Sequence, residues 1–290
     1  MRCSEIDLHM HTRVSDGTDA PEEIPAKVKA AGIRLFSVTD HDDIRSGERI
    51  PPLLRSGDPA FVTGVEFSCR DEGGKYHVLG YGFDPKAPGL RAVAEHGHQI
   101  RMRKVTARLD FLKTEFGISF PQEEVDRLRA LDNPGKPHIG NLLVKYGHAE
   151  TKDTAIRHYL DGLRFREEHL RPEEAVRGIL AGGGIPVLAH PAYGDGDQLI
   201  LGEELDARVR RLMDFGLQGL EGFYSGFSTR ICQEVLSLAA RYGLYVTAGS
   251  DYHGGNKLVT LGDTGLDPDR DYPDGLLRFL KDVHYDHTAV

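Results

Sequence analysis

The sequence predicts an α/β protein in which a barrel-like sheet, wrapped by helices, carries an inserted helical subdomain. Seven short apolar runs bounded by turn residues alternate with stretches of helical periodicity, which is the pattern of a parallel sheet covered by helices. The alternation breaks once, between residues 89 and 169, where only helical patterns occur. The length of 290 residues suits one large domain of this kind or two smaller ones.

The expected strands are runs of four to six residues. In chain order they are Glu5–Leu8, Leu35–Thr39, Ala60–Val65, Tyr76–Tyr81, Ile185–Ala189, Gly219–Phe223 and Leu244–Ala248. Helices of the barrel part are expected at Pro21–Ala31, Pro172–Leu180, Glu203–Phe215 and Thr229–Tyr242. The first and last of these helices are ended by Gly32 and Gly243, because glycine readily adopts the left-handed conformation that closes a helix.

The inserted subdomain is expected to cover residues 89–169, and the barrel domain residues 1–88 and 170–290. Helices of the insert are predicted at Leu90–Phe116, Gln122–Leu131, Pro137–Tyr146 and Lys152–Leu160. Residues 101–171 contain 14 Lys and Arg against 11 Asp and Glu, so this segment carries a charge of +3 and the rest of the chain −12. A mildly basic insert over an acidic barrel indicates where an anionic substrate would bind.

The overall composition excludes some classes of function. With 36 Lys and Arg against 45 Asp and Glu, the net charge of −9 argues against attachment to nucleic acid or membrane by bulk charge. Three widely spaced cysteines make neither a disulfide framework nor a cysteine zinc site. Glu5 and Asp7 stand where a secretory segment needs positive and apolar residues, and no apolar stretch approaches the ~20 residues that span a bilayer. A soluble cytoplasmic protein is therefore expected.

Histidines gather at the ends of the predicted strands. Six of the 14 histidines follow or lie in these strands, and three acidic residues occupy matching places. At the carboxyl rim of a parallel barrel these side chains would meet. Imidazole and carboxylate are ligands of zinc, manganese and iron, so the pattern predicts a metal site. The nine candidate ligands are His9, His11, Asp16, His41, Glu66, His77, His190, Asp251 and His253.

The spacing of paired histidines separates candidate ligands from surface residues. Alternate residues of a strand point to the same face, so His9 and His11 can bind one ion. His96 and His98 have the same spacing within a predicted helix, where it places the side chains about 200° apart. We therefore expect His96 and His98 to be surface residues.

Several motifs occur in the order found in one superfamily. They are His9-Met10-His11-Thr12, Ser15-Asp16-Gly17, Thr39-Asp40-His41-Asp42, Gly64-Val65-Glu66, Tyr76-His77-Val78, Ala189-His190-Pro191 and Gly249-Ser250-Asp251-Tyr252-His253. Together they resemble the successive motifs of the PHP (polymerase and histidinol phosphatase) superfamily. The insert, around Asp132-Asn133-Pro134 and Pro137-His138, resembles that of the bacterial PHP phosphoesterases acting on nucleoside 3',5'-bisphosphates and short RNA. The resemblance implies a distorted (β/α)7 barrel and a phosphoric ester hydrolase with two or three divalent ions of manganese, zinc or iron.

The resemblance also implies how the nine ligands divide among three ions. The first ion would be held by His9, His11, Glu66 and Asp251. The second would be held by Glu66, as a bridge, with His77 and His190. The third would be held by Asp16, His41 and His253, although some relatives have a histidine at the position of Asp16. His190 and Asp251 are the expected catalytic residues.

Three dications and three carboxylates give the filled site a charge of about +3, which favours an anionic substrate. The implied mechanism is in-line attack on phosphorus by a hydroxide that bridges two ions, because metal binding lowers the pKa of water towards about 7. His190 or a metal-bound water is the candidate acid for the leaving group. Asp7, Asp40 and Asp42 are expected to orient ligand imidazoles through their other ring nitrogen.

Basic side chains near these motifs are candidates for binding substrate phosphate, because Arg and Lys pair with phosphate oxygens. We expect this role for Arg13, Lys136, His138 and Arg230. The segment 161–166 stands where a Gly-Lys-Pro-Gly-Tyr-like loop is expected, and Arg164 or Arg166 is the candidate replacement for the lysine of that loop. The expected partner is a small phosphorylated substrate or short RNA, without a stable nucleic-acid complex or membrane contact. The oligomeric state is not predicted.

The leading hypothesis is a metal-dependent phosphoesterase for nucleoside 3',5'-bisphosphates or short RNA ends. Phosphorylated sugars and cyclic phosphodiesters are alternative substrates. An amidohydrolase-like C–N hydrolase is a second enzyme class, because barrels with His-x-His and a late Asp also catalyse that reaction, although no position for a carboxylated lysine is evident on a middle strand. A regulatory module with a structural metal site is the alternative that is not an enzyme, and the complete ligand set argues against it.

Overall fold

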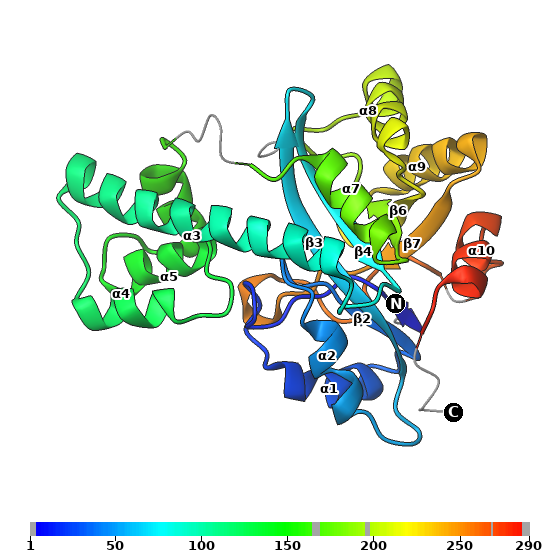
Figure 1. Ribbon diagram of the computed structural model, residues 1–290, viewed down its shortest axis with the longest axis horizontal. Coiled ribbons are helices and arrows are strands. Elements are labelled where there is room, and N and C mark those ends of the chain that lie inside the picture. Colours follow the sequence, from blue (N-terminus) through cyan, green and yellow to red (C-terminus); the bar gives the residue numbers. More distant parts are fainter. Residues whose placement is uncertain (1–3, 164–168, 195–197, 268, 286–290) are drawn as a thin grey trace.

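The computed structural model describes residues 4–163, 169–194, 198–267 and 269–285. Its centre is one seven-stranded sheet, whose strands follow one another in chain order from β1 to β7. The sheet curls into a nearly closed barrel with helices on its outer side, and a long helical arm projects from it (Figure 1). This arrangement confirms the predicted fold class, a distorted barrel with a helical insert.

All seven predicted strands are present. Their bounds are β1 Ile6–Asp7, β2 Leu35–Val38, β3 Ala60–Asp71, β4 Gly74–Tyr81, β5 Ile185–Leu188, β6 Gly219–Tyr224 and β7 Tyr245–Gly249. Neighbouring strands are parallel except at β4, which runs antiparallel to both β3 and β5. The expectation of a wholly parallel sheet is therefore wrong for β4, because an apolar run marks a buried strand but carries no information about its direction.

Strands β3 and β4 form a hairpin that carries a residue of β4 to the rim. β3 continues to Asp71, six residues past its predicted end, and the chain then turns back at Gly74. Gly74 has a φ of +115°, a conformation that side chains disfavour. The ladder pairs Ser68 with His77. A residue in the middle of β4 thus reaches the same rim as residues that follow the parallel strands.

Single backbone hydrogen bonds join the residues that follow β1 to the end of β7 and the residues after it. Leu8 N–H donates to the carbonyl of Ala248 at 2.9 Å, and Asp251 N–H donates to the carbonyl of His9 at 2.8 Å. These bonds continue β1 and β7 into the loops that follow them. The loops after the two strands are therefore held side by side at one rim of the barrel.

The buried carboxylate of Asp7 fastens the same junction from within. Its Oδ1 atom accepts the backbone N–H of Ser250 at 2.9 Å, and its Oδ2 atom accepts the Ser250 hydroxyl at 2.7 Å and the backbone N–H of Gly262 at 2.8 Å. Burial raises the pKa of Asp7 to about 6, although these hydrogen bonds oppose the shift. Both carboxylate oxygens thus accept hydrogen bonds from the segment that follows β7.

The predicted helices of the barrel part are also confirmed. A 3-10 turn, η1 Pro21–Glu23, leads into α1 Ile24–Ala30, and the others are α7 Pro172–Ala181, α8 Gly202–Phe215 and α9 Thr229–Tyr242. The prediction missed the short α2 Ser46–Arg49, α10 Asp274–Asp282, and the 3-10 turns η2 Pro51–Leu53 and η4 Gly254–Asn256. The elements of three or four residues are too short to show a helical period, whereas the nine residues of α10 are long enough for one. None of the described helices is both long and apolar enough to cross a membrane.

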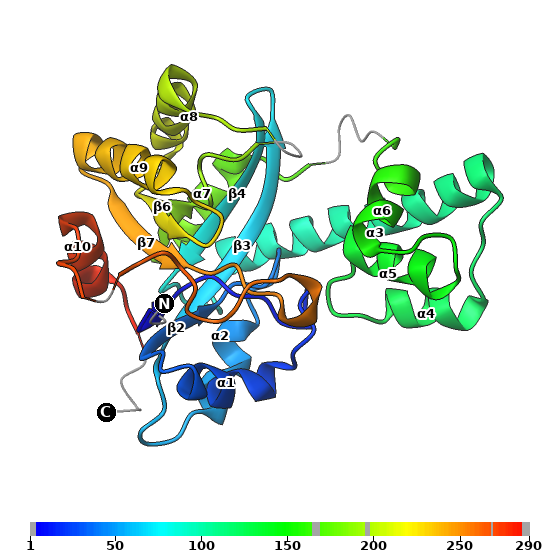
Figure 2. The same ribbon diagram turned by 180° about the vertical axis from the view of Figure 1, so that it is seen from behind.

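The insert is built on one long helix. Its elements are α3 Pro88–Phe116, α4 Gln122–Arg129, α5 Lys136–Lys145, α6 Lys152–Ala155 and the π-helical turn η3 Ile156–Leu160. α3 begins beside α7 on the barrel and continues outwards, where the shorter helices pack on it (Figures 1 and 2). These helices enclose a hydrophobic core of their own, which includes Val105, Leu112, Ile139 and Leu143. The boundary of the subdomain at residues 89–169 stays a prediction.

We expect Asp7→Asn to lower the free energy of unfolding by about 2 kcal/mol, because the new NH2 group must face a buried donor that the carboxylate accepted. Urea denaturation of the metal-free protein measures this change. The control is Asp214→Asn on the exposed side of α8, which should change stability by less than about 0.5 kcal/mol. Equal stabilities of the two variants would contradict the role given to Asp7.

Candidate metal centre

The nine predicted ligands converge at one rim of the barrel. Eight of them form three overlapping groups, in each of which the nitrogen and oxygen ligand atoms all lie within 4.8 Å of one another. These groups are His11, Asp16, His41 and His253; His9, His11 and Asp251; and His41, Glu66 and His77. The ninth residue, His190, lies 3.3 Å from Glu66 through its Nε2 atom.

Glu66 on β3 is the carboxylate around which the imidazoles gather. Its Oε2 atom lies 3.1–3.3 Å from nitrogens of three histidines, and its Oε1 atom lies 2.8 and 3.3 Å from two more. In that order, the five residues are His9, His11, His41, His77 and His190. Because Glu66 is only 1% exposed, its charge requires compensation from these neighbours or from ions between them.

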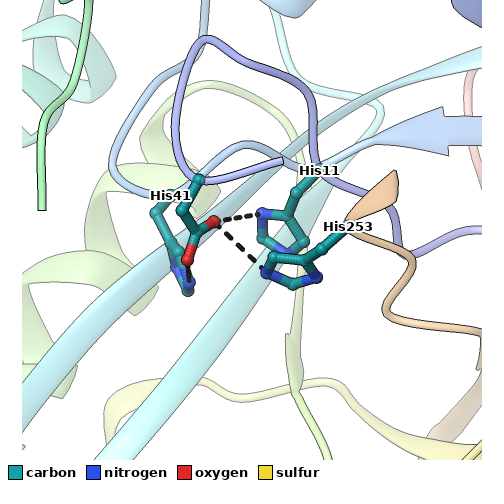
Figure 3. Close-up of side chains that lie close together, drawn as sticks. His11, His41 and His253 are labelled. Carbon is teal, nitrogen blue, oxygen red and sulfur yellow. Dashed lines mark ion pairs between the residues drawn. The ribbon is translucent and has the colours of Figure 1, made fainter. Parts of the chain in front are cut away.

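Asp16, in the loop after β1, serves another part of the cluster. Its Oδ1 atom is 3.2 Å from His253 Nε2 and 3.8 Å from His11 Nδ1, and its Oδ2 atom is 3.9 Å from His41 Nε2. Figure 3 shows the three imidazoles of this group around one carboxylate, with dashed lines for the ion pairs. The group matches the third ligand set implied by the resemblance, with His11 added.

The distances between the candidate ligand atoms match those between atoms that bind one ion. Bonds of about 2.1 Å at tetrahedral angles place neighbouring ligand atoms about 3.4 Å apart. The Nε2 atoms of His9 and His11 lie 3.5 and 3.4 Å from Asp251 Oδ1, and within the described ranges neither nitrogen has a hydrogen-bond partner. A buried lone pair that faces carboxylate oxygens needs a positive charge between them. The donor set therefore fits divalent cations.

Glu221 on β6 orients the ring of His9. Its Oε1 atom lies 2.8 Å from His9 Nδ1, which must donate because a carboxylate can only accept, so Nε2 is left for the cluster. Its Oε2 atom accepts the backbone N–H of His190 at 2.7 Å. A bulge between Glu221 and Phe223 shifts the register with β7 at this point. A Cβ atom on Gly249 would lie 2.2 Å from the Cβ atom of His9, so only glycine fits beside this pair.

Asp251 is oriented by two residues outside the cluster. Its Oδ2 atom accepts from Lys257 Nζ at 2.6 Å and from the Tyr224 hydroxyl at 3.0 Å, which leaves Oδ1 facing the imidazoles. Asp251 and His190 have positive φ values of 59° and 27°. Residues other than glycine keep such a backbone only when the surrounding contacts stabilise it. The loops that carry these two ligands are thus held in a strained conformation.

The carboxylates favour protonation of the two central histidines. Burial opposes a charge on His11, but the neighbouring Asp251 and Glu66 raise its pKa to about 9. Burial also opposes a charge on His9, and Glu221 and Glu66 raise its pKa well above the ordinary value. Without ions, protons on these rings would therefore balance the buried negative charge near pH 7.

Two other rings of the cluster behave in the opposite way. Burial lowers the pKa of His77 to about 4, although Glu66 opposes the shift. Burial also lowers the pKa of His41 well below its ordinary value. Both imidazoles are thus neutral near pH 7, which is the form that binds metal ions.

Two aspartates expected to orient ligand imidazoles act elsewhere. Asp7 holds backbone and hydroxyl donors, as described above. Asp40 accepts the backbone N–H and the hydroxyl of Thr12 and the hydroxyl of Ser15, each at 2.7–2.8 Å. The Ser15 hydroxyl lies 3.4 Å from His11 Nδ1. Asp40 therefore acts on an imidazole only through Ser15, and the expectation was wrong for Asp7.

Asp42, the third of these aspartates, ties the barrel to the insert. Its carboxylate accepts the backbone N–H of Ser68 at 2.9 Å and pairs with the guanidinium of Arg101 on α3 at 2.5 Å. No imidazole of the described residues is among its hydrogen-bond partners. The expectation that Asp42 orients a ligand was also wrong.

Glu221, Tyr224 and Lys257 were missed by the sequence interpretation. A glutamate inside the apolar run 219–223 is the signal that could have indicated Glu221, because a carboxylate in a buried strand needs a partner. No comparable signal marks Tyr224 or Lys257, which reach Asp251 only through the folding of their loops.

The second His-x-His pair takes no part in the cluster. His96 and His98 lie on α3, as predicted, and the side chain of His96 is 45% exposed and pairs with Glu174 at 2.7 Å. His98 Nδ1 lies 3.3 Å from the side-chain oxygen of Asn133. The same spacing thus places two candidate ligands together after a strand, whereas on a helix it gives surface contacts.

A basic cleft of about 390 Å³ adjoins the cluster on the side of the insert. It extends from Asp16, His41 and His77 to helices α3 and α5. Its lining contains two acidic and six basic residues, and the basic ones are Arg70, Lys75, Arg101, Lys104, Arg108 and Lys136. Such a surface favours anions next to the candidate ligands.

The predicted substrate residues fall in different places. Lys136 lines the basic cleft. His138, on the same helix, is half-buried and does not line it. Arg13, with 66% of its side chain exposed, and Arg230, exposed in the first turn of α9, also lie outside the lining. Arg164, like the rest of residues 164–168, lies outside the described residues.

Comparison with curated proteins defines the class of enzyme. The chain is 32% identical over 264 residues to the 3',5'-nucleoside bisphosphate phosphatase of Chromobacterium violaceum, an alignment that covers 86% of this chain and 87% of that enzyme. It is 29% identical to a phosphoribosyl 1,2-cyclic phosphate 1,2-diphosphodiesterase of Eggerthella lenta, over 86% and 94% of the two chains. It is 26% identical to a 5'-3' exoribonuclease of Haemophilus influenzae, over 86% and 90%. The chain is a metal-dependent phosphoesterase.

It belongs to the PHP family, and 3',5'-nucleoside bisphosphate phosphatase is a member of that family to which it is related. A solved structure from Bifidobacterium adolescentis, assigned as a metal-dependent phosphoesterase, superposes with a TM-score of 0.77 at 26% identity over 91% and 93% of the chains. A structure described as an amidohydrolase from Chromobacterium violaceum, with bound sulfate, gives a TM-score of 0.80 at 27% identity over 96% of each chain. No family model matches the chain.

We expect Glu221→Gln to weaken Mn²⁺ binding by about 10- to 100-fold, because His9 and His190 donate to different oxygens of Glu221 and the NH2 group of Gln would face one of these donors. Isothermal titration of the metal-free protein measures the dissociation constant. The control, Glu203→Gln on the exposed first turn of α8, should bind Mn²⁺ as the wild type does. Wild-type affinity in the Glu221 variant would contradict the orienting role.

Metal binding should release protons at pH 7, because the pKa of His11 is raised to about 9 and an ion must displace the proton it carries. The apparent affinity for Mn²⁺ should therefore rise between pH 6 and pH 9. Titration calorimetry in two buffers of different ionisation enthalpy gives the number of protons released. His96→Gln should leave that number unchanged, and equal heats in both buffers would disprove the linkage.

Proposed function

We propose that this chain hydrolyses a phosphate ester of nucleoside 3',5'-bisphosphates or of short RNA ends. The observation that carries the proposal is the basic cleft beside the ligand cluster. A substrate with one phosphate group at the cluster can place a second phosphate group in this cleft, where Lys and Arg pair with its oxygens. Identity of 32% to a nucleoside bisphosphate phosphatase supports the same class of substrate.

The cluster would hold two or three divalent ions. The proposed first ligand set is His9, His11, Glu66 and Asp251, the second Glu66, His77 and His190, and the third Asp16, His41 and His253. Manganese, zinc and iron are the candidate ions, because imidazole and carboxylate together suit all three. When bound, such ions neutralise phosphoryl oxygens and lower the pKa of a water nucleophile.

His190 and Asp251 are the proposed catalytic residues. His190 lies at the edge of the cluster, with 17% of its side chain exposed, and its Nε2 atom would either bind the second ion or, in a site that holds only the other ions, face the oxygen of the leaving group. Its backbone N–H donates to Glu221, which holds the backbone of His190 in place. Asp251 presents Oδ1 to the cluster because Lys257 and Tyr224 engage its other oxygen.

A cyclic phosphodiester that carries a second phosphate group is the alternative substrate. The relative from Eggerthella lenta has this activity, and its phosphoribosyl substrate would also use a basic cleft. A sugar with a single phosphate would leave that cleft unfilled. An uncharged amide would not pair with the basic side chains of the cleft, which argues against a C–N hydrolase. One structural neighbour is nevertheless described as an amidohydrolase.

Hydrolysis by the Mn²⁺-loaded protein tests the proposed function, measured as phosphate released from the monoesters and as chromatographic products of the RNA, the cyclic phosphate and the amide. The substrates to compare are adenosine 3',5'-bisphosphate, a 5'-phosphorylated RNA trinucleotide, ribose 5-phosphate, a ribose cyclic phosphate and an N-acyl amino acid. Adenosine bisphosphate or the RNA should have the highest kcat/KM. Cleavage of the amide without hydrolysis of any phosphate ester would overturn the proposal.

Lys104→Ala should raise KM for adenosine 3',5'-bisphosphate by about tenfold, because a hydrogen bond to a charged group contributes about 1.5–3 kcal/mol. KM for adenosine monophosphates, which lack the second phosphate group, should change little. Steady-state kinetics with both substrates measures the difference. Lys113→Ala, on an exposed part of α3, is the matched control, and an equal effect of Lys104→Ala on both substrates would argue against a second phosphate site.

A further inference from the structure

A second cleft, of about 530 Å³, lies beside the metal centre at the end of β6. Its walls are the end of β6, the first turns of α9 and parts of the segment 264–273. Three aromatic side chains line it, those of Phe223, Tyr224 and Phe227. None of the roles described above uses this aromatic cleft, although one of its walls touches the cluster.

Tyr224 forms the partition between the aromatic cleft and the metal centre. Its ring lines the cleft, while its hydroxyl donates to Asp251 Oδ2 at 3.0 Å. Its ring centroid also lies 5.4 Å from that of His190. A group that fills the cleft is therefore one aromatic ring away from two of the candidate ligands.

The aromatic wall is held rigidly. The ring centroids of Tyr224 and Phe227 are 5.2 Å apart, and Tyr193 lies 5.8 Å from Phe227 and 6.1 Å from Tyr224. The hydroxyl of Tyr193 donates to the carbonyl of Gly226 at 2.7 Å, which fastens the loop after β5 to the loop after β6. Rigid aromatic faces stack with planar heterocycles at low entropic cost.

The remaining lining distinguishes this cleft from the basic one. Its charged residues are Asp267, Arg270 and Asp271, so acidic groups outnumber basic ones and a phosphate group is disfavoured. The carboxamide of Gln233 offers both a donor and an acceptor, which suits the edge of a heterocyclic base. The lining therefore matches an uncharged aromatic part of a ligand.

We propose that the aromatic cleft binds the nucleobase of the substrate, so that the enzyme selects nucleotides over phosphorylated sugars. The inference rests on the proposed function and deepens it. A nucleoside bisphosphate would place its base against Phe227, the phosphate to be cleaved at the ligand cluster, and its second phosphate in the basic cleft. The metal centre thus lies between a site for the base and a site for an anion.

Substitution of Phe227 tests the proposal through a pair of substrates. Adenosine 3',5'-bisphosphate is compared with the corresponding 1-deoxyribose bisphosphate, which lacks the base. For Phe227→Leu, the ratio of kcat/KM for the nucleotide to that for the baseless compound should fall about tenfold, mainly through KM, because stacking contributes that much per base. Phe227→Tyr, which keeps the aromatic face, should retain the ratio. Phe116→Leu, at a 41% exposed phenylalanine of the insert, is the control and should also retain it.

Binding to the metal-free protein separates this proposal from the proposed function. Titration calorimetry with adenosine 3',5'-bisphosphate should give about tenfold weaker binding for Phe227→Leu than for the wild type. If the nucleotide binds in this manner but is not hydrolysed by the Mn²⁺-loaded enzyme, the proposed function fails and the base site stands. Equal affinities of the two proteins, no measurable binding by the wild type, or an equal loss for the baseless compound would overturn the base site.

Discussion

The buried carboxylate of Glu66 imposes the constraint on which the rest of the site depends. It is 1% exposed and has five imidazoles within 3.3 Å, and such a group requires positive charge in its surroundings. The neighbouring contacts direct ligand atoms towards the positions where that charge must lie. Glu221 turns Nε2 of His9 inwards, and Lys257 leaves one oxygen of Asp251 for the cluster. These contacts also explain how a strained backbone persists at the rim.

The fold could be predicted where a local pattern determines it. Apolar runs located all seven strands, and the histidines at the ends of those runs indicated the candidate ligands that the structure brings together. The direction of β4 could not be predicted, because a buried strand has the same apolar pattern whether it is parallel or antiparallel to its neighbours. His77 therefore reaches the rim from the middle of its strand, opposite Ser68, and not from a strand end.

The surroundings of the ligands were less accessible to prediction. Arg13 is close to the ligands in sequence, yet its side chain points to solvent with 66% exposure. The basic cleft instead combines the β3–β4 hairpin with α3, two parts that are adjacent only after the insert packs on the barrel. Lys257 and Tyr224 likewise meet Asp251 through loop conformations that no periodicity encodes. Site residues that are brought together by long-range packing thus could not be predicted from the sequence, whereas residues at strand ends could.

The insert has a hydrophobic core of its own, and it supplies other residues to the candidate site than the barrel does. All nine candidate ligands come from the barrel, whereas the insert supplies basic residues such as Lys104 and Lys136. The helices beyond Val105 stabilise one another, and polar contacts such as that of Asn133 with the carbonyl of His41 join them to the loops of the candidate ligands. Under the proposed function, changes on the side of the insert that lines the basic cleft would alter the recognition of a second phosphate group, while the barrel keeps the candidate ligands. For protein engineers, a transplanted helical arm would have to keep Arg101 and Asn133, which bond to Asp42 and His41 of the barrel.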